Sequence, residues 1–282
     1  NLDSAVEFYQ EALKYNESHE KAIMALAKVY EKQGKVDQCM HYCNRMVIID
    51  PSHEEASTLM AELLLQRNQE EEALTCFKRL LENKAGNYTI LAKLLSVLKR
   101  GGKLQQFAQF LHNAEKTKGR SADAGVAYCK GLYLRYQGLN KEALEELNKA
   151  RNDAAYGQPT LEQMIDIYLY SEEELLSGRV PPQNIEAAET LLQELRSKFV
   201  SMRSEVLQAL LLIAKGGSSN LDKGCTQLQQ LLNNKPYYVP GILACAVGKH
   251  LQGSQQNAFQ LLSRLDEIAY TNEFAEDMER GW

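Results

Sequence analysis

Cys39 and Cys43 have the spacing best suited to metal chemistry, because a four-residue step places both thiols on one face of a helix. A structural zinc site needs four ligands, commonly two close pairs, and no second pair lies near these two. Free cysteine packs as a small apolar residue. We therefore expect both thiols in a helical core, and we predict no metal site. The same packing role is expected of the remaining cysteines, Cys76, Cys129, Cys225 and Cys245.

Two acidic runs, 70–72 and 172–174, bring carboxylates together as general acid–base catalysis would require. The first is expected at the start of a helix, where it suits the helix dipole, and the second in a solvated loop. The five histidines are dispersed, and no phosphate loop, nucleophile elbow, metalloprotease or dinucleotide motif is present. Residues 216–220, Gly-Gly-Ser-Ser-Asn, lack the following Gly-Lys-Ser/Thr and are predicted to form a turn. We expect neither enzymatic activity nor a cofactor.

The charge of the chain disfavours nucleic acid as a partner. The net charge is −5 over 282 residues, whereas nucleic-acid affinity comes mostly from concentrated Lys and Arg. One basic cluster, at 99–103 with Lys93 and Arg79, could meet an acidic partner, but no aromatic stacking platform is interleaved with it. It is interpreted as a solvated face.

The chain also gives no sign of membrane insertion or secretion. No apolar run approaches the roughly 20 residues of a membrane span, so we expect no direct insertion. Residues 1–4 show no secretory signal. The unpaired cysteine spacing indicates reduced thiols in a cytosolic type of compartment.

A small residue followed four and seven positions later by apolar or small residues recurs along the chain. The first instance is Ala5, Tyr9 and Ala12. The leading positions lie at 5, 39, 73, 107, 143, 188, 224 and 258. The first three steps are 34 residues, which is the tetratricopeptide period.

Two further registers have the same phase. The leading positions of this pattern are called anchors below. A helix-stopping residue is expected five positions before the anchors at 39, 73, 107, 143, 224 and 258; these residues are Gly34, Asn68, Gly102, Gly138, Ser219 and Gly253. Pro51 and Pro236 lie twelve residues after an anchor, where proline ends one helix and opens the next. The core signature on both helices of a unit comprises Ala27, Ala61, Gly131, Ala73, Ala143, Ala188 and Ala258. Each unit is thus predicted to be a helix A, a turn and a helix B.

These registers predict an all-α fold, a right-handed superhelical solenoid of tetratricopeptide repeats that continues over residues 1–282. The expected order is a half repeat at 1–19 and units near 20–53, 54–87, 88–121, 124–157, 158–202, 205–238 and 239–272, with a further helix starting at 273–282. The unit at 158–202 carries eleven extra residues, and we predict an inserted loop at 171–187 because Gly178, Pro181 and Pro182 break helices. Both ends cut through a repeat, so we expect a piece of a longer array.

Some repeats carry more than the generic pattern. Residues 128–134 read Tyr-Cys-Lys-Gly-Leu-Tyr-Leu and lead to Tyr136 and Gly138, then to Ala143-Leu144 and Asn148-Lys149-Ala150-Arg151. Upstream, Gly102-Lys103-Leu104 precedes Ala114-Glu115-Lys116; downstream, Glu273-Phe274 precedes Trp282. This pattern resembles the C-terminal half of the tetratricopeptide repeat protein 21 family, the all-repeat subunit of intraflagellar transport complex A. Members of that family also carry an insertion after the position of Tyr170.

The resemblance implies a non-catalytic scaffold for retrograde ciliary transport and for ciliary entry of membrane cargo. The partners that it implies are other complex A subunits, neighbouring train components and cargo adaptors. The implied location is the cilium, the ciliary base and the cytoplasm.

Three other functions compete with this one. A chaperone-type clamp for a peptide carboxylate presents Lys and Asn from the fifth and ninth positions of helix A. Here those positions hold Met24 and Lys28, Thr58 and Glu62, Ala92 and Ser96, and Tyr128 and Leu132. A regulatory arm of an enzyme stays open, and an RNA-processing helical repeat is disfavoured by the net charge.

The binding surface is expected on the concave face, lined by helices A, because stacked repeats create such surfaces. It would hold an extended segment or a helix of another subunit. The helical wheel indicates five exposed candidates for protein binding, Lys28, Glu31, Glu62, Lys93 and Arg135.

Overall fold

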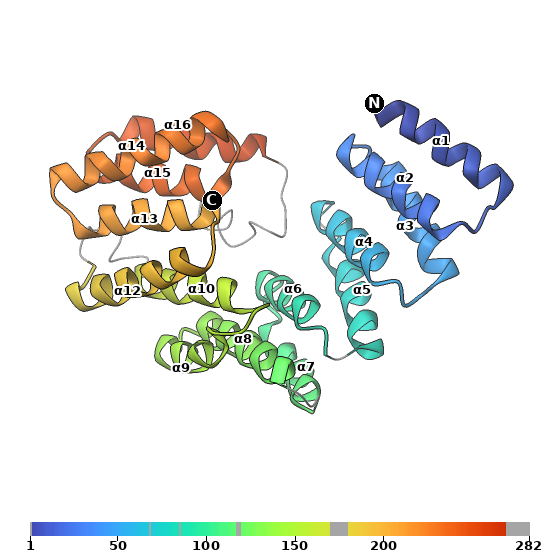
Figure 1. Cartoon of the computed structure of the whole chain (residues 1–282), viewed down its shortest axis with the longest axis horizontal. Helices are drawn as coiled ribbons and strands as arrows, with labels where there is room; N and C mark the ends of the chain where they lie inside the picture. The colour runs from blue at the N-terminus through green and yellow to red at the C-terminus, as the bar shows by residue number, and fades with distance from the viewer. Residues whose placement is uncertain (1, 68, 85, 117–119, 170–179, 269–282) are drawn as a thin grey trace. The chain divides into compact units, whose positions relative to one another are not determined.

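The computed structural model describes residues 2–67, 69–84, 86–116, 120–169 and 180–268, with the side chains of 120–122 excluded (Figure 1). Across these ranges the regular elements are all helical, and no strand is present. The chain divides into two compact units, residues 1–117 and residues 118–282. The boundary falls inside the predicted repeat 88–121, four residues before its end.

Unit 1 consists of a single helix followed by three antiparallel hairpins. Its helices are α1 (Leu2–Tyr15), α2 (Glu20–Lys32), α3 (Val36–Ile49), α4 (Glu54–Gln66), α5 (Glu70–Asn83), α6 (Tyr88–Arg100), the 3-10 turn η1 (Leu104–Gln106) and α7 (Phe107–Glu115). Helices α2, α4 and α6 are helices A, and α1, α3, α5 and α7 are helices B.

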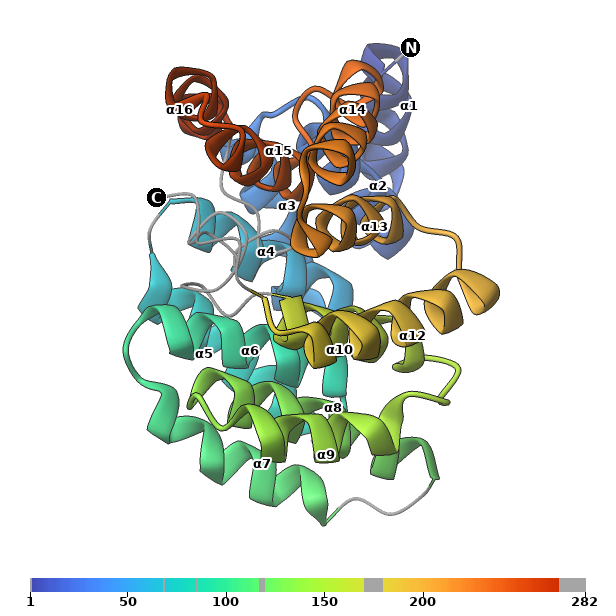
Figure 2. The ribbon, with the colours of Figure 1, turned by 90° about the vertical axis from the view of Figure 1, so that its left-hand side faces the viewer.

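Over its described residues, unit 2 consists of four such hairpins. Its helices are α8 (Arg120–Tyr136), α9 (Asn140–Ala150), α10 (Gly157–Leu169), α12 (Pro182–Lys198), α13 (Met202–Lys215), α14 (Ser218–Asn234), α15 (Val239–Leu251), α16 (Gln255–Ser263) and the 3-10 turn η2 (Arg264–Glu267). Helices A of this unit are α8, α10, α13 and α15. Helix α13 packs against both α10 and α15, so helices A of successive repeats lie side by side (Figure 2).

Small side chains let the two helices of each hairpin approach closely. Ala27 and Ala61 on helices A, and Ala73, Ala143 and Ala188 on helices B, have no exposed surface, and Ala258 is 7% exposed. Larger residues such as Phe77 and Leu147 fill the space around them and are also fully buried. The core of each unit is thus a seam between helices, and the apolar residues that form it recur with the repeat.

The turns inside the hairpins depend on glycine. Gly34 and Gly138 adopt φ of 68° and 81°, a left-handed conformation that costs glycine little. Gly102 and Gly253 do the same, as predicted. Ser219 was expected to stop a helix, and this was wrong, because it lies inside α14. Gly216 and Gly217, with φ of 69° and 79°, make that turn instead. Asn68 lies outside the described residues.

Pro51 and Pro236 each lie in the turn before a helix A, two residues or fewer from its N-cap. The inserted loop was predicted at 171–187. Residues 170–179 lie outside the described part of the chain. From Pro182 onward the prediction was wrong, because α12 starts there with proline at its first position, where the missing N–H is not needed. The predicted helix at 273–282 also lies outside the described residues.

The prediction of an all-α fold made of stacked helical hairpins is confirmed. The continuity of the array from unit 1 into unit 2 stays a prediction. Each unit thus has its own set of helices A. Four of the five predicted binding residues lie on the helices A of unit 1, and the fifth lies on a helix A of unit 2.

Candidate protein-binding surfaces

The helices A of unit 1 carry a row of charged side chains. Lys28 and Glu31 lie on α2, Glu62 on α4 and Lys93 on α6. Lys28 Nζ is 2.6 Å from Glu55 Oε1, also on α4, and Lys93 Nζ is 2.5 Å from Glu62 Oε1. The structure thus brings the four predicted residues of unit 1 together with Glu55. We call Lys28, Glu31, Glu55, Glu62 and Lys93 the charged strip.

The electrostatics of the charged strip couple its members across repeats. Burial raises the pKa of the Glu31 carboxyl, and the negative charge of Glu62 raises it further, whereas Lys28 opposes the shift. The Glu62 carboxylate therefore acts on Glu31 on one side and pairs with Lys93 on the other.

The exposure of the charged strip allows contact with a partner. The side chains of Lys28 and Glu55 are 49% and 54% exposed, while those of Lys93 and Glu62 are 30% and 31% exposed. Exposed ion pairs contribute little to stability, about 0–1 kcal/mol. Lys28 and Glu55 can therefore exchange each other for charges of a partner at small cost. The sequence reasoning missed Glu55, although it lies seven residues before Glu62 and so on the same face of α4.

The fifth predicted residue, Arg135 on α8 in unit 2, donates from Nη1 to Gln163 Oε1 on α10. A buried polar cluster follows farther along α10. Arg203 Nη2 on α13 is 2.8 Å from Asp166 Oδ2, and only 2% of the Asp166 side chain is exposed. Burial raises the pKa of Glu162, which accepts hydrogen bonds from Gln158 and Ser201. The two carboxylates are held by α10 and α13 themselves, so this cluster fixes the contact between helices.

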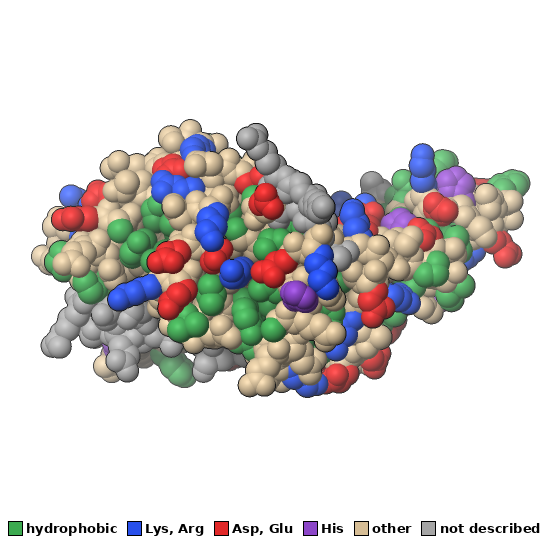
Figure 3. Space-filling view, turned by 90° about the horizontal axis from the view of Figure 1, so that it is seen from below, with side chains coloured by type: hydrophobic (Ala, Val, Ile, Leu, Met, Phe, Trp, Pro, Cys, Tyr) green, Lys and Arg blue, Asp and Glu red, His purple; other side chains and the backbone are tan. Residues whose placement is uncertain are grey.

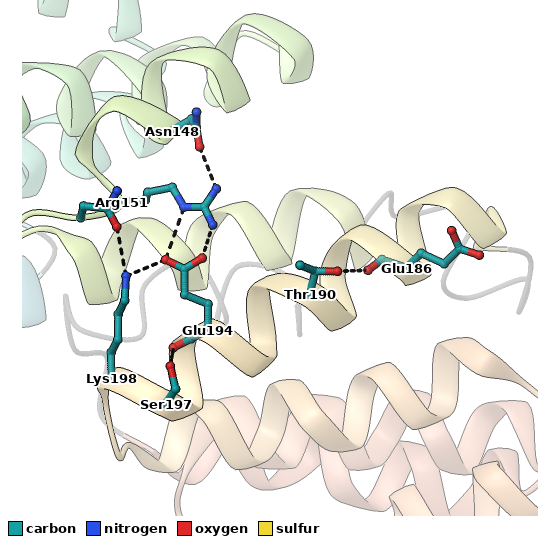
Figure 4. A network of polar contacts seen from close by, with 8 residues as sticks. Asn148, Arg151, Glu186, Thr190, Glu194, Ser197 and Lys198 are labelled. Carbon is teal, nitrogen blue, oxygen red and sulfur yellow. Dashed lines mark hydrogen bonds and ion pairs between the residues drawn. The ribbon is translucent and has the colours of Figure 1, made fainter.

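Helices B of unit 2 meet through a second network, on α9 and α12 (Figure 4). Arg151, just past the end of α9, donates from Nε and Nη2 to the two carboxylate oxygens of Glu194, and from Nη1 to Asn148. Lys198 donates to Glu194 at 2.7 Å and to Asn152 at 3.0 Å. The Arg151 hydrogen bonds hold the pKa of Glu194 below its usual range. A groove of about 450 Å³ beside this network is lined by Leu144, Asn148, Arg151, Met164, Tyr168 and Leu191, among others.

A third kind of contact recurs at the edge where helices A turn into helices B. An acidic side chain near the start of a helix B meets a donor at the end of the next helix A. The pairs are Asp3 with Gln33, Asp37 with Arg67, Glu71 with Lys103, and Asp222 with Gln252. The same edge contact thus recurs between neighbouring repeats in both units.

The cysteines lie where core packing requires. All six are buried, and Cys39 and Cys43 have no exposed surface. The hydrogen bond that the Cys43 thiol donates to Cys39, and then burial, raise the pKa of Cys43, and burial raises the pKa of Cys245 to about 11. Over the described ranges, no group of three or more metal-ligating side chains is found. The same part of the chain holds no helix with the length and apolar character to cross a bilayer.

The charged side chains are mixed in sign. On the face drawn in Figure 3, Lys and Arg side chains lie interspersed with Asp and Glu side chains. The basic cluster that the sequence singled out follows this pattern. Arg100 pairs with Glu70 at 3.0 Å, and Lys103 pairs with Glu71. The acidic partners of Arg100 and Lys103 thus offset the positive charge of this cluster.

Family models of helical repeats match most of the chain. Residues 54–169 match the "TT21 fifth ARM repeats domain", and residues 187–282 match the "Tetratricopeptide repeat protein 21 C-terminal ARM domain". Residues 1–80 match "Anaphase-promoting complex, cyclosome, subunit 3". The two models of one family thus cover parts of both structural units.

Solved structures show the same fold. Yeast Tom70 aligns over 99% of this chain and 58% of its own, with a TM-score of 0.62 and 14% identity. A tetratricopeptide repeat protein from Parabacteroides merdae aligns over 94% of this chain and 99% of its own, with a TM-score of 0.55 and 12% identity. At these identities the likeness establishes the tetratricopeptide-type solenoid and nothing about function.

Curated relatives match the chain from end to end. Human tetratricopeptide repeat protein 21A is 29% identical over 99% of this chain, and human 21B is 30% identical over 100% of it. The homologue from Caenorhabditis elegans is 26% identical over 74% of it. The chain spans 23% of the length of either human relative. With two models of the same family on either side of its inserted segment, the chain belongs to the tetratricopeptide repeat protein 21 family.

Proposed function

We propose that this chain is part of a non-catalytic scaffold subunit of intraflagellar transport complex A, acting in retrograde ciliary transport and in ciliary entry of membrane cargo. Its partners on this proposal are other complex A subunits, neighbouring train components and cargo adaptors, at the cilium, the ciliary base and in the cytoplasm. The observation that carries the proposal is the end-to-end similarity to tetratricopeptide repeat protein 21A and 21B.

The geometry suits a scaffold. Ion pairs join α2 to α4 and α4 to α6, so charges from three repeats lie together on unit 1 and can face one partner. The charged strip holds three carboxylates and two ammonium groups, and the repulsion between Glu31 and Glu62 leaves room for an added cation. We therefore expect unit 1 to hold a helix or an extended segment that carries Lys or Arg opposite Glu31.

The first test is affinity purification of the full-length protein from ciliated cells, read by mass spectrometry. The proposal expects the other complex A subunits in stoichiometric amounts. Recovery of chaperones or of an enzyme partner in their place would contradict it and favour a peptide-binding adaptor or a regulatory arm.

A pair of variants then tests the surface itself. The double exchange Glu62→Lys with Lys93→Glu keeps an ion pair between α4 and α6 but reverses its direction, so the fold should be retained while the field facing the partner changes. Reversal of the Glu71–Lys103 pair by Glu71→Lys with Lys103→Glu is the matched control, because it also reverses an ion pair without changing the net charge. We expect the exchange to reduce recovery of a partner and the control to leave it unchanged. Equal recovery with both variants would exclude the charged strip as the contact.

A further inference from the structure

The three helices A of unit 1 are capped from one position of the repeat. His19, His53 and Asn87 are the N-cap residues of α2, α4 and α6, and they lie 34 residues apart. His19 Nδ1 accepts from the Ala22 backbone N–H at 3.3 Å, and His53 Nδ1 accepts from Ala56 at 3.2 Å. Asn87 Oδ1 accepts from the Ile90 N–H at 3.2 Å. Two repeats therefore use imidazole for a cap that the third makes with an amide.

The chemistry of the two kinds of cap differs. A backbone N–H can only donate, so the Nδ1 of each histidine must hold its lone pair and the ring must be neutral. Protonation makes both ring nitrogens donors, which removes the acceptor. It also places a positive charge at the positive end of the helix dipole. An asparagine amide undergoes no such change across the range in which histidine charges, pH 5 to 8.

We propose that the caps made by His19 and His53 make the first turns of α2 and α4 sensitive to protons. On acidification these two turns lose their caps and fray, while the Asn87 cap keeps the first turn of α6 intact. The capped state excludes the proton, so acid shifts the equilibrium toward the uncapped state. Local stability at the two helix starts is thus present at neutral pH and is lost as pH falls.

Charged groups around His53 act in both directions. Asp50, on the C-terminal side of α3, interacts with His53 and would favour the imidazolium. Glu54 and Glu55, in the first turn of α4, would do the same, but Lys84 lies 3.6 Å from Glu54 and Lys28 pairs with Glu55. Asp50 is thus the main charge that promotes protonation of His53 and loss of its cap.

The surroundings of His19 are also mixed. Glu17 and Glu20 flank it, and Lys21 follows in the first turn of α2. Lys14 lies in the last turn of α1, and Arg45 of α3 donates to the Glu17 backbone carbonyl. The cations on α1 and α3 disfavour a further positive charge at this end of the helix.

The other histidines provide a contrast within the chain. His112 and His250 lie in the last turns of α7 and α15, where the helix dipole favours a positive charge. His41 lies edge-on against Tyr42 inside α3 and caps no helix. Acidification should therefore loosen α2 and α4 specifically, and a general weakening of every helix is not expected.

Amide hydrogen exchange of the 282-residue chain at pH 7.5 and 5.5, corrected for the intrinsic rate, tests whether the two caps respond to pH. We expect protection of the Ala56 amide to fall about three- to tenfold, the factor that corresponds to loss of one cap. Protection of the Ala22 amide should fall less, because this amide also donates to the His19 carbonyl at 3.0 Å. The Ile90 amide should keep its protection. An equal fall at all three amides, or none at Ala22 and Ala56, would overturn the proposal.

Exchanging the caps separates the proposal from a general acid effect. The double variant His19→Asn with His53→Asn should fold, because asparagine is a good cap, and its α2 and α4 amides should lose their pH dependence. Asn87→His should bring the Ile90 amide under the same pH dependence, and His41→Asn should change nothing. If the double variant keeps the wild-type pH dependence, the histidines are not the sensors.

Nitrogen-15 spectra of the imidazoles test the tautomer that the caps require. They must show the proton on Nε2 at pH 7.5, and an Nδ1–H tautomer would contradict the caps.

Discussion

Gly131 of α8 lies directly against Leu147 of α9, so closely that a Cβ on residue 131 would be 2.6 Å from Leu147 Cγ. Leu147 is fully buried and the Ala143 carbonyl closes another side, at 3.3 Å from the same Cβ position. Neither neighbour can move freely. The contact explains why a helix interior carries a residue that usually weakens helices.

Gly131→Ala should therefore destabilise unit 2. A methyl group in a helix would ordinarily add about 1 kcal/mol, but overpacking against Leu147 costs about 1–3 kcal/mol. We expect a net loss of about 1 kcal/mol in the free energy of unfolding, measured in denaturant. Combining it with Leu147→Ala should cost less than the sum of the two single changes, because the smaller side chain leaves room for the methyl group. Additive losses would mean that residue 131 does not pack against Leu147.

Ala73→Arg tests the packing of a hairpin in unit 1. Ala73 lies on α5 with no exposed surface, in the seam that α5 forms with α4. An arginine there must bury a charge without a partner or push the two helices apart, at a cost of several kcal/mol. We expect a lower melting temperature, loss of helical circular dichroism from unit 1 and loss of partner binding. Thr75→Arg, two residues on and exposed, is the control; an Ala73→Arg protein as stable as this control would contradict the assigned register.

The parts of this molecule that follow the repeat could be predicted from the sequence. Small residues twelve apart, such as Ala61 and Ala73, identify the helices that meet, because close approach of two helices needs small side chains at the crossing. The stop at Ser219 was misplaced for a physical reason. A positive φ is cheap for glycine, so the turn formed at Gly216 and Gly217, and α14 could start three residues before the expected position.

The contacts between repeats were harder to predict. Lys93 and Glu62 were both expected to be exposed on helices A, yet their pairing depends on how far successive helices rotate, which spacing does not reveal. Arg151 and Glu194 are 43 residues apart. The segment inserted between them removes the constant step, so the register could not place α12 beside α9.

Glu194→Gln should weaken the contact between α9 and α12. The carboxylate accepts two hydrogen bonds from Arg151 and one from Lys198 (Figure 4), and hydrogen bonds to charged groups contribute about 1.5–3 kcal/mol. We expect a loss of about 1–2 kcal/mol at pH 7. Arg151 lowers the folded-state pKa of Glu194. The contribution of the Glu194 carboxylate to folding stability is therefore present above the ordinary glutamate pKa and is lost as pH falls through the lowered value. The difference between wild type and variant should therefore shrink in acid, and Glu205→Gln, on the exposed side of α13, should show no such difference at any pH.

Glu162→Gln should have the opposite effect. Burial on α10 raises the pKa of Glu162, although Gln158, Arg203 and Ser201 oppose the shift. A raised folded-state pKa means that the favourable contribution of this group exists below the ordinary glutamate pKa and is lost as pH rises through the raised value. The ionised side chain thus weakens the fold at pH 7, and glutamine keeps an oxygen that can accept from Gln158 and Ser201. We expect the variant to melt at a higher temperature than wild type at pH 7, with the gain declining toward pH 4. Thermal melts across this range check the sign, and a variant that melts lower at pH 7 would show that the charge of Glu162 is needed to hold Arg203 in place.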